Sequence, residues 1–254
     1  MSDWKLWRTH FEKQASRPLP MLVGVSGTWP AGWREQLATS LAIFQLGEAG
    51  EGRIAREIDA CTIPAIDADY RTALKLFVAE EQRHAKILAR MVLELKGHLL
   101  HATWTERLFR QARRLLGIRF KLLVLLVAEV IGISFYGTLS NQLPIGSLRF
   151  ALAEICKDEE FHLRFHAAFF RAQMHGLSHR LIFAAAWHVV GTAAMLVVLW
   201  DHRRLLRTFH IPMTHMAATF SRLLRSAYHR SIDTRLRDEL LTLPLAAAPT
   251  PSVK

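Results

Sequence analysis

The stretch Glu80-Glu81-Gln82-Arg83-His84 carries a glutamate and a histidine three residues apart, and Asp158-Glu159-Glu160-Phe161-His162 repeats this Glu-x-x-His pattern 78 positions later. Both stretches lie in sequence with helical periodicity. Residues three apart share one face of an α-helix, so the carboxylate and the imidazole of each pair can reach the same metal ion. No other Glu-x-x-His pair occurs in the chain. The two pairs therefore predict a shared metal site.

The same offset points to a further glutamate in each half of the chain. Glu129 precedes Glu159 by 30 residues, and Glu51 precedes Glu81 by the same interval. We therefore predict that Glu51 and Glu129 are single ligands on two further helices. Glu48, about one helical turn before Glu51, is the alternative ligand on the first of these helices.

The midpoints of these two intervals fall where turns are expected. Pro144 lies at one midpoint, and the segment 64–67, which begins with proline, contains the other. Proline and turn residues end helices, so each half is expected to form a helix, a short turn and an antiparallel helix. The single glutamate and the Glu-x-x-His pair of each half then lie at similar depth.

The predicted ligand set has the composition of a two-metal centre. Two Glu-x-x-His pairs and one glutamate from each of two further helices form the site of di-iron and di-manganese helix bundles. Four carboxylates offset the charge of two divalent cations, and oxygen and nitrogen ligands favour iron or manganese over metals that prefer thiolate. The predicted metal ligands are Glu51, Glu81, His84, Glu129, Glu159 and His162.

Two more side chains are candidates for roles near these ligands. His166 lies seven residues after Glu159 and is a candidate extra ligand, with a packed core histidine as the alternative. Tyr136 lies two turns after the single glutamate of its helix and is a candidate for hydrogen bonding or electron relay at the site. Glu80 and Arg83 are expected to face solvent or neighbouring helices.

The fold is expected to be all-α. The chain has 254 residues, of which 51% are hydrophobic, and few segments alternate as strands do. We expect a helix through residues 122–133, an apolar helix over 181–200, and further helices over about 34–60, 67–96, 147–175 and 212–242. Residues 98–120 are basic and are expected to form a long crossover that contains a short amphipathic helix.

The chain is expected to divide into an N-terminal arm, a helical domain and a C-terminal tail. Residues 1–35 contain several prolines and glycines and are expected to form an irregular arm, either wrapped on the bundle or, given its tryptophans, at a membrane interface or as a lid. The helical domain is expected over residues 36–242, with the bundle over about 36–175 and added helices over about 178–242. Residues 243–254 are rich in alanine and proline and are expected to be disordered.

The charge balance allows several kinds of partner. The chain has 33 lysines and arginines against 22 acidic residues, for a net charge of +11. A solvated basic surface explains this, and so does contact with an acyl carrier protein, anionic lipid or RNA. The two cysteines form no disulfide framework and the polar N-terminus predicts no cleavable signal peptide, which together favour the cytoplasm.

One segment raises the question of membrane association. Residues 181–200 contain no lysine, arginine, aspartate or glutamate, and the run is long enough to span a bilayer. Small residues, together with His188 and Thr192, favour a buried fifth helix that packs on the bundle. A helix that dips into the membrane, as part of a peripheral membrane contact, is the alternative.

The ligand pattern resembles that of the ferritin-like di-iron carboxylate superfamily over about residues 40–175. The run from Glu80 to His84 is similar to the corresponding run in rubrerythrins and acyl carrier protein desaturases. The resemblance implies an antiparallel four-helix bundle with a long crossover between its second and third helices, and two extra C-terminal helices follow it here. It implies two iron ions, or manganese or a mixed pair, with Glu81 and Glu159 as bridging ligands. The cysteine pairs of the rubredoxin domain are missing, which argues against a built-in electron donor.

The resemblance implies an oxidoreductase that uses O2 to hydroxylate, desaturate or N-oxygenate an organic substrate. The substrate is expected to be an apolar small molecule or a group bound to an acyl carrier, and the electrons to come from an external donor. Ferroxidase, peroxidase or manganese-catalase chemistry is one alternative, and a non-catalytic scaffold is another. A homodimer is compatible with the pattern, and a nucleic-acid substrate is less favoured. A buried tunnel that reaches Glu51 would support the first function.

Overall fold

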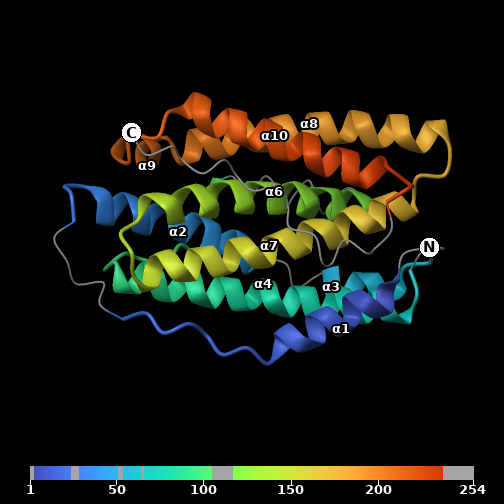
Figure 1. The fold of residues 1–254 in the computed structure, drawn as a ribbon, viewed down its shortest axis with the longest axis horizontal. Helices are drawn as coiled ribbons and strands as arrows, with labels where there is room; N and C mark the ends of the chain where they lie inside the picture. Colours follow the sequence, from blue (N-terminus) through green and yellow to red (C-terminus); the bar gives the residue numbers. More distant parts are fainter. Residues whose placement is uncertain (1–2, 24–28, 51–53, 64–65, 105–116, 237–254) are drawn as a thin grey trace.

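The structure is a computed structural model that describes residues 3–23, 29–50, 54–63, 66–104 and 117–236. Within these ranges every regular element is a helix, so the predicted all-α class is confirmed. Four long helices lie in the middle of the molecule (Figure 1). They are α2 (Trp33–Glu48), α4 (Ala68–Glu94), α6 (Ile118–Gln142) and α7 (Ser147–Ala172).

The four long helices pack as two pairs of sequence neighbours. Helix α2 packs along α4 and helix α6 packs along α7, and α4 also contacts α7 (Figure 1). The Asp67 side chain caps the start of α4 by accepting a hydrogen bond from the Tyr70 amide at 2.8 Å. After α4, Gly97 lies so close to α2 that a Cβ atom there would stand 2.6 Å from the Ala38 Cβ. Only glycine allows α2 and α4 to approach this closely.

The buried apolar residues form two clusters, with a polar layer between them. On α4, Phe77 and Val78 belong to one cluster and Ile87 and Leu88 to the other. Helix α7 is divided in the same way, since Ile155 and the residues before it belong to one cluster, and Leu163 and those after it to the other. The two Glu-x-x-His pairs lie between these groups. The apolar clusters therefore enclose the predicted metal site from both ends.

The helix predicted over 34–60 is broken in the structure. Helix α2 ends at Glu48, and a short helix α3 (Ile54–Glu57) and a 3-10 turn η2 (Ile58–Ala60) follow as separate elements. Three glycines between positions 47 and 52 explain the break, because each costs a helix about 1 kcal/mol relative to alanine. Residue Glu51 lies outside the described residues.

The prediction that residues 1–35 are irregular is wrong for the first half of the segment. Residues Trp4–Ala15 form helix α1, which packs along α4 (Figure 1). Asp3 caps the helix by accepting a hydrogen bond from the Leu6 amide. Trp7 and Phe11 are almost fully buried in the core, so α1 packs against the other helices as a regular element.

Three C-terminal helices cover α6 and α7 on one side. They are α8 (Leu177–Asp201), α9 (Arg203–Thr208) and α10 (Met213–Ile232), and they form the outermost layer of the molecule there (Figure 1). Helix α10 ends ten residues before the predicted limit of 242. The predicted tail 243–254 and most of the crossover 98–120 lie outside the described residues.

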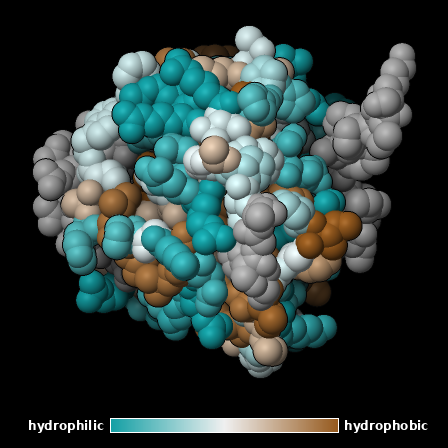
Figure 2. Space-filling model, turned by 90° about the vertical axis from the view of Figure 1, so that its left-hand side faces the viewer, coloured by the Kyte–Doolittle hydropathy of each residue, from teal (hydrophilic) through white to brown (hydrophobic). Residues whose placement is uncertain are grey.

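Among the helices in the described part of the chain, two are long and apolar enough to cross a membrane by length and composition. In the most apolar 18-residue segment of α6, 72% is buried inside the protein, so the apolar character of α6 is that of a core helix. In the corresponding 18-residue segment of α8, only 22% is buried. The prediction that residues 181–200 form a buried fifth helix is therefore wrong for most of this helix. The end of the molecule where α8 leads into α9 is mostly hydrophilic, with apolar residues in separate patches (Figure 2).

Candidate metal centre

The two Glu-x-x-His pairs converge between α4 and α7. Glu81, His84, Glu159 and His162 are all buried, and one ligand atom from each lies within 4.8 Å of the others. Helical periodicity places each glutamate beside its own histidine, and the packing of α4 against α7 places the two pairs together. The four residues therefore form a buried cluster that can hold a metal ion.

Both imidazoles turn the same nitrogen toward the carboxylates. His84 Nδ1 lies 3.2 Å from Glu159 Oε1 and 3.6 Å from Glu81 Oε1. His162 Nδ1 lies 2.8 Å from Glu81 Oε1 and 3.0 Å from Glu159 Oε2. Each histidine is thus directed at the carboxylates of both helices, as ligands of a shared centre must be.

The other nitrogen of each imidazole faces the acid that precedes the glutamate of the opposite pair. His84 Nε2 lies 3.2 Å from Asp158 Oδ2, and His162 Nε2 lies 3.1 Å from Glu80 Oε2. A carboxylate that accepts from Nε2–H fixes the tautomer and leaves the Nδ1 lone pair for a metal. Glu80 was expected to face solvent or a neighbouring helix. It does not face solvent, because it is buried against His162.

A guanidinium from the N-terminal segment binds both of these outer acids. Arg17 Nη2 lies 2.5 Å from Glu80 Oε1 and 2.6 Å from Asp158 Oδ2. Arg83 lies nearby, with its guanidinium 2.5 Å from Glu154 Oε1 and 3.8 Å from Asp158 Oδ2. The outer acids therefore have cationic partners of their own. In the sequence, the two outer acids could be recognised because each directly precedes a ligand glutamate. No feature of the sequence near Arg17 indicated that it would bind them.

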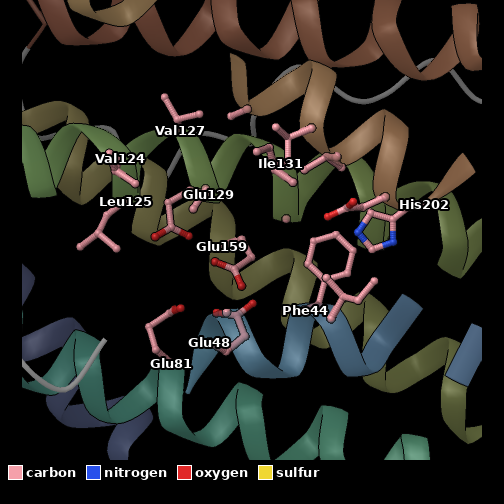
Figure 3. A pocket seen from close by; sticks show the side chains of 18 of the residues that line it. Phe44, Glu48, Glu81, Val124, Leu125, Val127, Glu129, Ile131, Glu159 and His202 are labelled. Atoms are coloured by element: carbon pink, nitrogen blue, oxygen red, sulfur yellow. The ribbon is translucent and has the colours of Figure 1, made fainter. Parts of the chain in front are cut away.

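Two more glutamates complete the carboxylate group. Glu129, on α6, is buried, and its Oε2 lies 3.6 Å from His162 Nδ1. Glu48, on α2, accepts a hydrogen bond of 2.7 Å from the Tyr136 hydroxyl. Figure 3 shows Glu48, Glu81, Glu129 and Glu159 pointing toward one another.

The structure therefore brings Glu48 to the place that the sequence interval assigned to Glu51. The interval from Glu48 to Glu81 is 33 residues, whereas the interval from Glu129 to Glu159 is 30. The spacing of the ligands in the two halves of the chain therefore differs by three residues. Glu48 was the alternative ligand in the sequence, and it is the one that the described residues show at the centre.

The carboxyls of the cluster divide into two electrostatic classes. Burial and the nearby Glu81 raise the pKa of Glu48 well above its ordinary value, and burial and Glu159 do the same for Glu129. Burial also acts to raise the pKa of Glu81 and Glu159, but hydrogen bonds with Glu48 and Glu129, together with the nearby His84 and His162, lower it instead. The four carboxylates are thus close enough to shift one another's pKa values in opposite directions.

The buried atoms at the centre of the cluster fit a metal. Within the described part of the chain, Glu81 Oε1, His84 Nδ1 and Glu159 Oε1 make no hydrogen bond of acceptable geometry, although all three are shielded from solvent. A buried polar atom without a partner costs about 1–3 kcal/mol, and more when it is charged. Divalent cations would satisfy these atoms and neutralise the carboxylates together.

His166 lies beside the cluster. Its Nε2 is 3.8 Å from Glu129 Oε1, and its ring packs edge-on against Phe77. Burial lowers the pKa of His166 to about 3, so the imidazole is neutral. Neither ring nitrogen makes a hydrogen bond within the described residues. His166 thus remains a candidate extra ligand, at a longer distance than the two motif histidines.

A largely apolar cavity of about 180 Å³ opens onto the carboxylate side of the cluster (Figure 3). It lies between α2, α6 and α8, and all four glutamates named above contribute to its wall. His202 lies at the far end of the view from Glu81 and is stacked on Phe44 at 4.6 Å. The apolar part of the lining includes Phe44, Val124, Leu125, Ile131, Val190, Ala194, Val197 and Val198.

Comparison with models of known protein families, with curated proteins and with solved structures finds no match for this chain. The assignment of the site therefore depends on its residues and their geometry.

Metal binding to this cluster is expected to release protons at pH 7, because a metal displaces protons from its ligands. Burial disfavours charged imidazole, but the surrounding carboxylates raise the pKa of His84 and His162 well above its ordinary value, so metal ions compete with protons for both imidazoles. Affinity for Mn(II) should therefore rise with pH between about 6 and 8. Titration calorimetry in buffers of different ionisation enthalpy measures the proton count. No proton release would show that the imidazoles do not bind the metal.

Proposed function

We propose that this protein is a ferritin-like di-metal carboxylate oxidoreductase that uses O2 to oxidise a small, largely apolar organic substrate. The cavity that ends on the four glutamates carries this proposal, because it offers a place for such a molecule directly beside the metal ligands. Antiparallel pairing of α2 with α4 and of α6 with α7, with ligands from all four helices, supports the ferritin-like assignment.

The proposed ligands are Glu48, Glu81, His84, Glu129, Glu159 and His162. They supply four carboxylates and two imidazoles, a set that suits iron or manganese. When bound, two such reduced ions would supply electrons for O2 activation, and an external donor would restore them. Glu80 and Asp158 would hold the two imidazoles in the tautomer that leaves Nδ1 free.

The cavity walls have two roles in this proposal. Apolar side chains from α6 and α8 exclude water from the reacting carbon or nitrogen, which limits side reactions. An engineered cavity of about 150 Å³ accommodates benzene, so about 180 Å³ suits a substrate with roughly one ring or a short chain. A larger substrate would have to leave part of itself outside the cavity.

One polar group in the wall can orient the substrate. The Ser40 hydroxyl lies 2.6 Å from His202 Nδ1, and burial lowers the pKa of His202 to about 3. The imidazole is therefore neutral and fixed by Ser40, and it can hydrogen-bond an uncharged polar group of the substrate. Such a contact would place the opposite, apolar end of the molecule toward the glutamates.

The alternatives make less use of these features. Ferroxidase, peroxidase or catalase chemistry acts on ions or small polar molecules and gains nothing from an apolar chamber of this size. A non-catalytic scaffold has no need for buried ligand atoms that lack hydrogen bonds. The cavity and the buried cluster together therefore favour oxidation of an organic substrate.

Filling the cavity provides the test. Val197→Phe, in the cavity wall on α8, is expected to reduce substrate-dependent O2 consumption by iron-loaded protein at least about tenfold, because the substrate is excluded. Bound metal and the oxidation of Fe(II) by O2 without substrate should be unchanged. A panel of small aromatic and aliphatic compounds, with a chemical reductant as donor, identifies the substrate to be assayed.

Val189→Phe is the matched control, since Val189 lies on the same helix but is exposed on its outer side. The control should keep full substrate-dependent activity. If no compound in the panel accelerates O2 consumption, and Val197→Phe oxidises Fe(II) as fast as the unaltered protein, metal or peroxide handling is the better assignment.

A further inference from the structure

Helix α8 presents a long apolar face to the outside of the molecule. Six large apolar side chains along it are between 59% and 72% exposed, which is unusual for one helix of a folded domain. At about 1.5 Å per residue, this face runs along roughly 35 Å. The six residues, which we call the α8 stripe, are Leu177, Leu181, Ile182, Val189, Leu196 and Trp200.

The opposite side of α8 packs against the rest of the protein. Phe183 and Trp187 are buried in the core, and a Cβ atom on Gly191 would lie 3.2 Å from the Leu224 side chain of α10. Val190 and Val197 line the cavity. With one side packed and the other exposed, α8 resembles a helix that lies in an interface rather than one surrounded by lipid.

The layer of helices that contains the α8 stripe is basic. From residue 177 to residue 232 the sequence contains seven arginines and no lysine, against the single acidic residue Asp201. Among them, Arg180, Arg204, Arg222 and Arg225 are exposed. This part of the chain therefore accounts for six of the eleven net positive charges.

The C-terminal end of the stripe combines an aromatic and a cationic group. The Arg203 guanidinium lies over the Trp200 ring, 4.1 Å from its centroid, and the indole is more than half exposed. Tryptophan and arginine side chains each have an apolar body and a polar end, and this combination favours the boundary between lipid and water.

We propose that the layer formed by α8, α9 and α10 binds the surface of an anionic lipid bilayer, with the α8 stripe in the interface and the arginines at the headgroups. The layer is the outermost one on its side of the molecule, so α8 and α10 can reach a flat surface together (Figure 1). A bilayer with acidic headgroups matches both the apolar stripe and the basic surround.

Charge distinguishes the bilayer from a second copy of the chain. A symmetric dimer through this layer would bring together two basic layers, each with seven arginines and one aspartate. Anionic lipid instead brings about 1 kcal/mol of attraction for each basic residue near the surface. The charge pattern therefore favours lipid over self-association.

The binding surface and the cavity share one helix. The outer side of α8 carries the stripe and its inner side lines the cavity, so an apolar molecule that leaves the bilayer would meet the cavity wall directly. Membrane binding itself does not depend on the proposed oxidation. It can be tested on the metal-free protein.

Sedimentation with vesicles tests the proposal. The protein is expected to bind vesicles of phosphatidylcholine with phosphatidylglycerol, and to bind phosphatidylcholine alone at least about tenfold more weakly. Raising the salt to about 0.5 M should weaken binding further, since exposed charges are screened. The double variant Leu181→Glu, Val189→Glu is expected to lose at least about tenfold in vesicle binding, because two side chains no longer enter the interface.

Two control variants make the result specific. Ile145→Glu, Phe150→Glu changes two exposed apolar residues away from α8 and should bind vesicles normally. Arg222→Gln, Arg225→Gln should bind anionic vesicles several-fold less and neutral vesicles unchanged. Circular dichroism establishes that each variant is folded.

Three outcomes would overturn the proposal. They are no binding to anionic vesicles, equal losses in the α8 variant and the Ile145/Phe150 control, and a dimer in lipid-free solution that the α8 variant dissociates. The last result would assign the stripe to a second copy of the chain. None of these outcomes bears on metal binding, so failure here leaves the proposed oxidation intact.

Discussion

Adding Fe(II) or Mn(II) to the metal-free protein is expected to raise its Tm by about 10 °C, and Glu159→Gln should remove most of this increase. A ligand present at about a thousand times its Kd stabilises the folded state by about 4 kcal/mol. For a domain of this size, each kcal/mol shifts Tm by about 2–4 °C. Glu159 contributes because its carboxylate lies within reach of both motif histidines.

The matched control for this prediction is the neighbouring residue. Glu160→Gln removes the same charge from the same helix, but Glu160 is half-buried at the surface, where its nearest cation is Arg164 at 3.9 Å. The Glu160 variant should keep the full increase in Tm and two metal ions per chain. Scanning calorimetry and metal analysis measure the two quantities. Equal responses of the two variants would show that the buried cluster is not the metal site.

Arg17→Met is expected to destabilise the metal-free protein by about 3 kcal/mol, which corresponds to a fall in Tm of roughly 6–12 °C. The variant leaves Glu80 and Asp158 without their shared guanidinium, and their side chains are only 7% and 5% exposed. Breaking a buried ion pair typically costs about 3–5 kcal/mol, and partial exposure of Arg17 reduces that value here. Methionine keeps most of the apolar stem of arginine, so the change mainly removes charge.

Arg8→Met provides the comparison for Arg17. Arg8 also joins the N-terminal region to α4, through Asp69 at 2.5 Å, but about a third of each side chain is exposed. Such a pair is worth about 0–1 kcal/mol. Urea denaturation of both variants should therefore show a clear difference. Similar losses would mean that α1 packing, rather than charge at the outer acids, explains the effect of Arg17.

The sequence alone determined the helical class and the residues at the centre of the cluster. Glu81, His84, Glu159 and His162 were identifiable because i, i+3 spacing fixes which side chains share a helical face, whatever the helix packs against. Glu129 was identifiable from its interval of 30 residues to Glu159, and the structure places it beside the two pairs. These inferences depend on local geometry, which the order of residues encodes directly.

The tertiary structure decided what depends on helix breaks and on distant partners. It placed Glu48, the last residue of α2, in the cluster, whereas the sequence interval assumed that this helix continues through Glu51. It also paired each motif histidine with the acid of the opposite motif and brought Arg17 to both acids. Such contacts join residues more than 60 positions apart, and they depend on how far each helix is rotated and shifted against its neighbour. The cavity and the exposed side of α8 arise in the same way, because burial is a property of packed helices and not of any one segment.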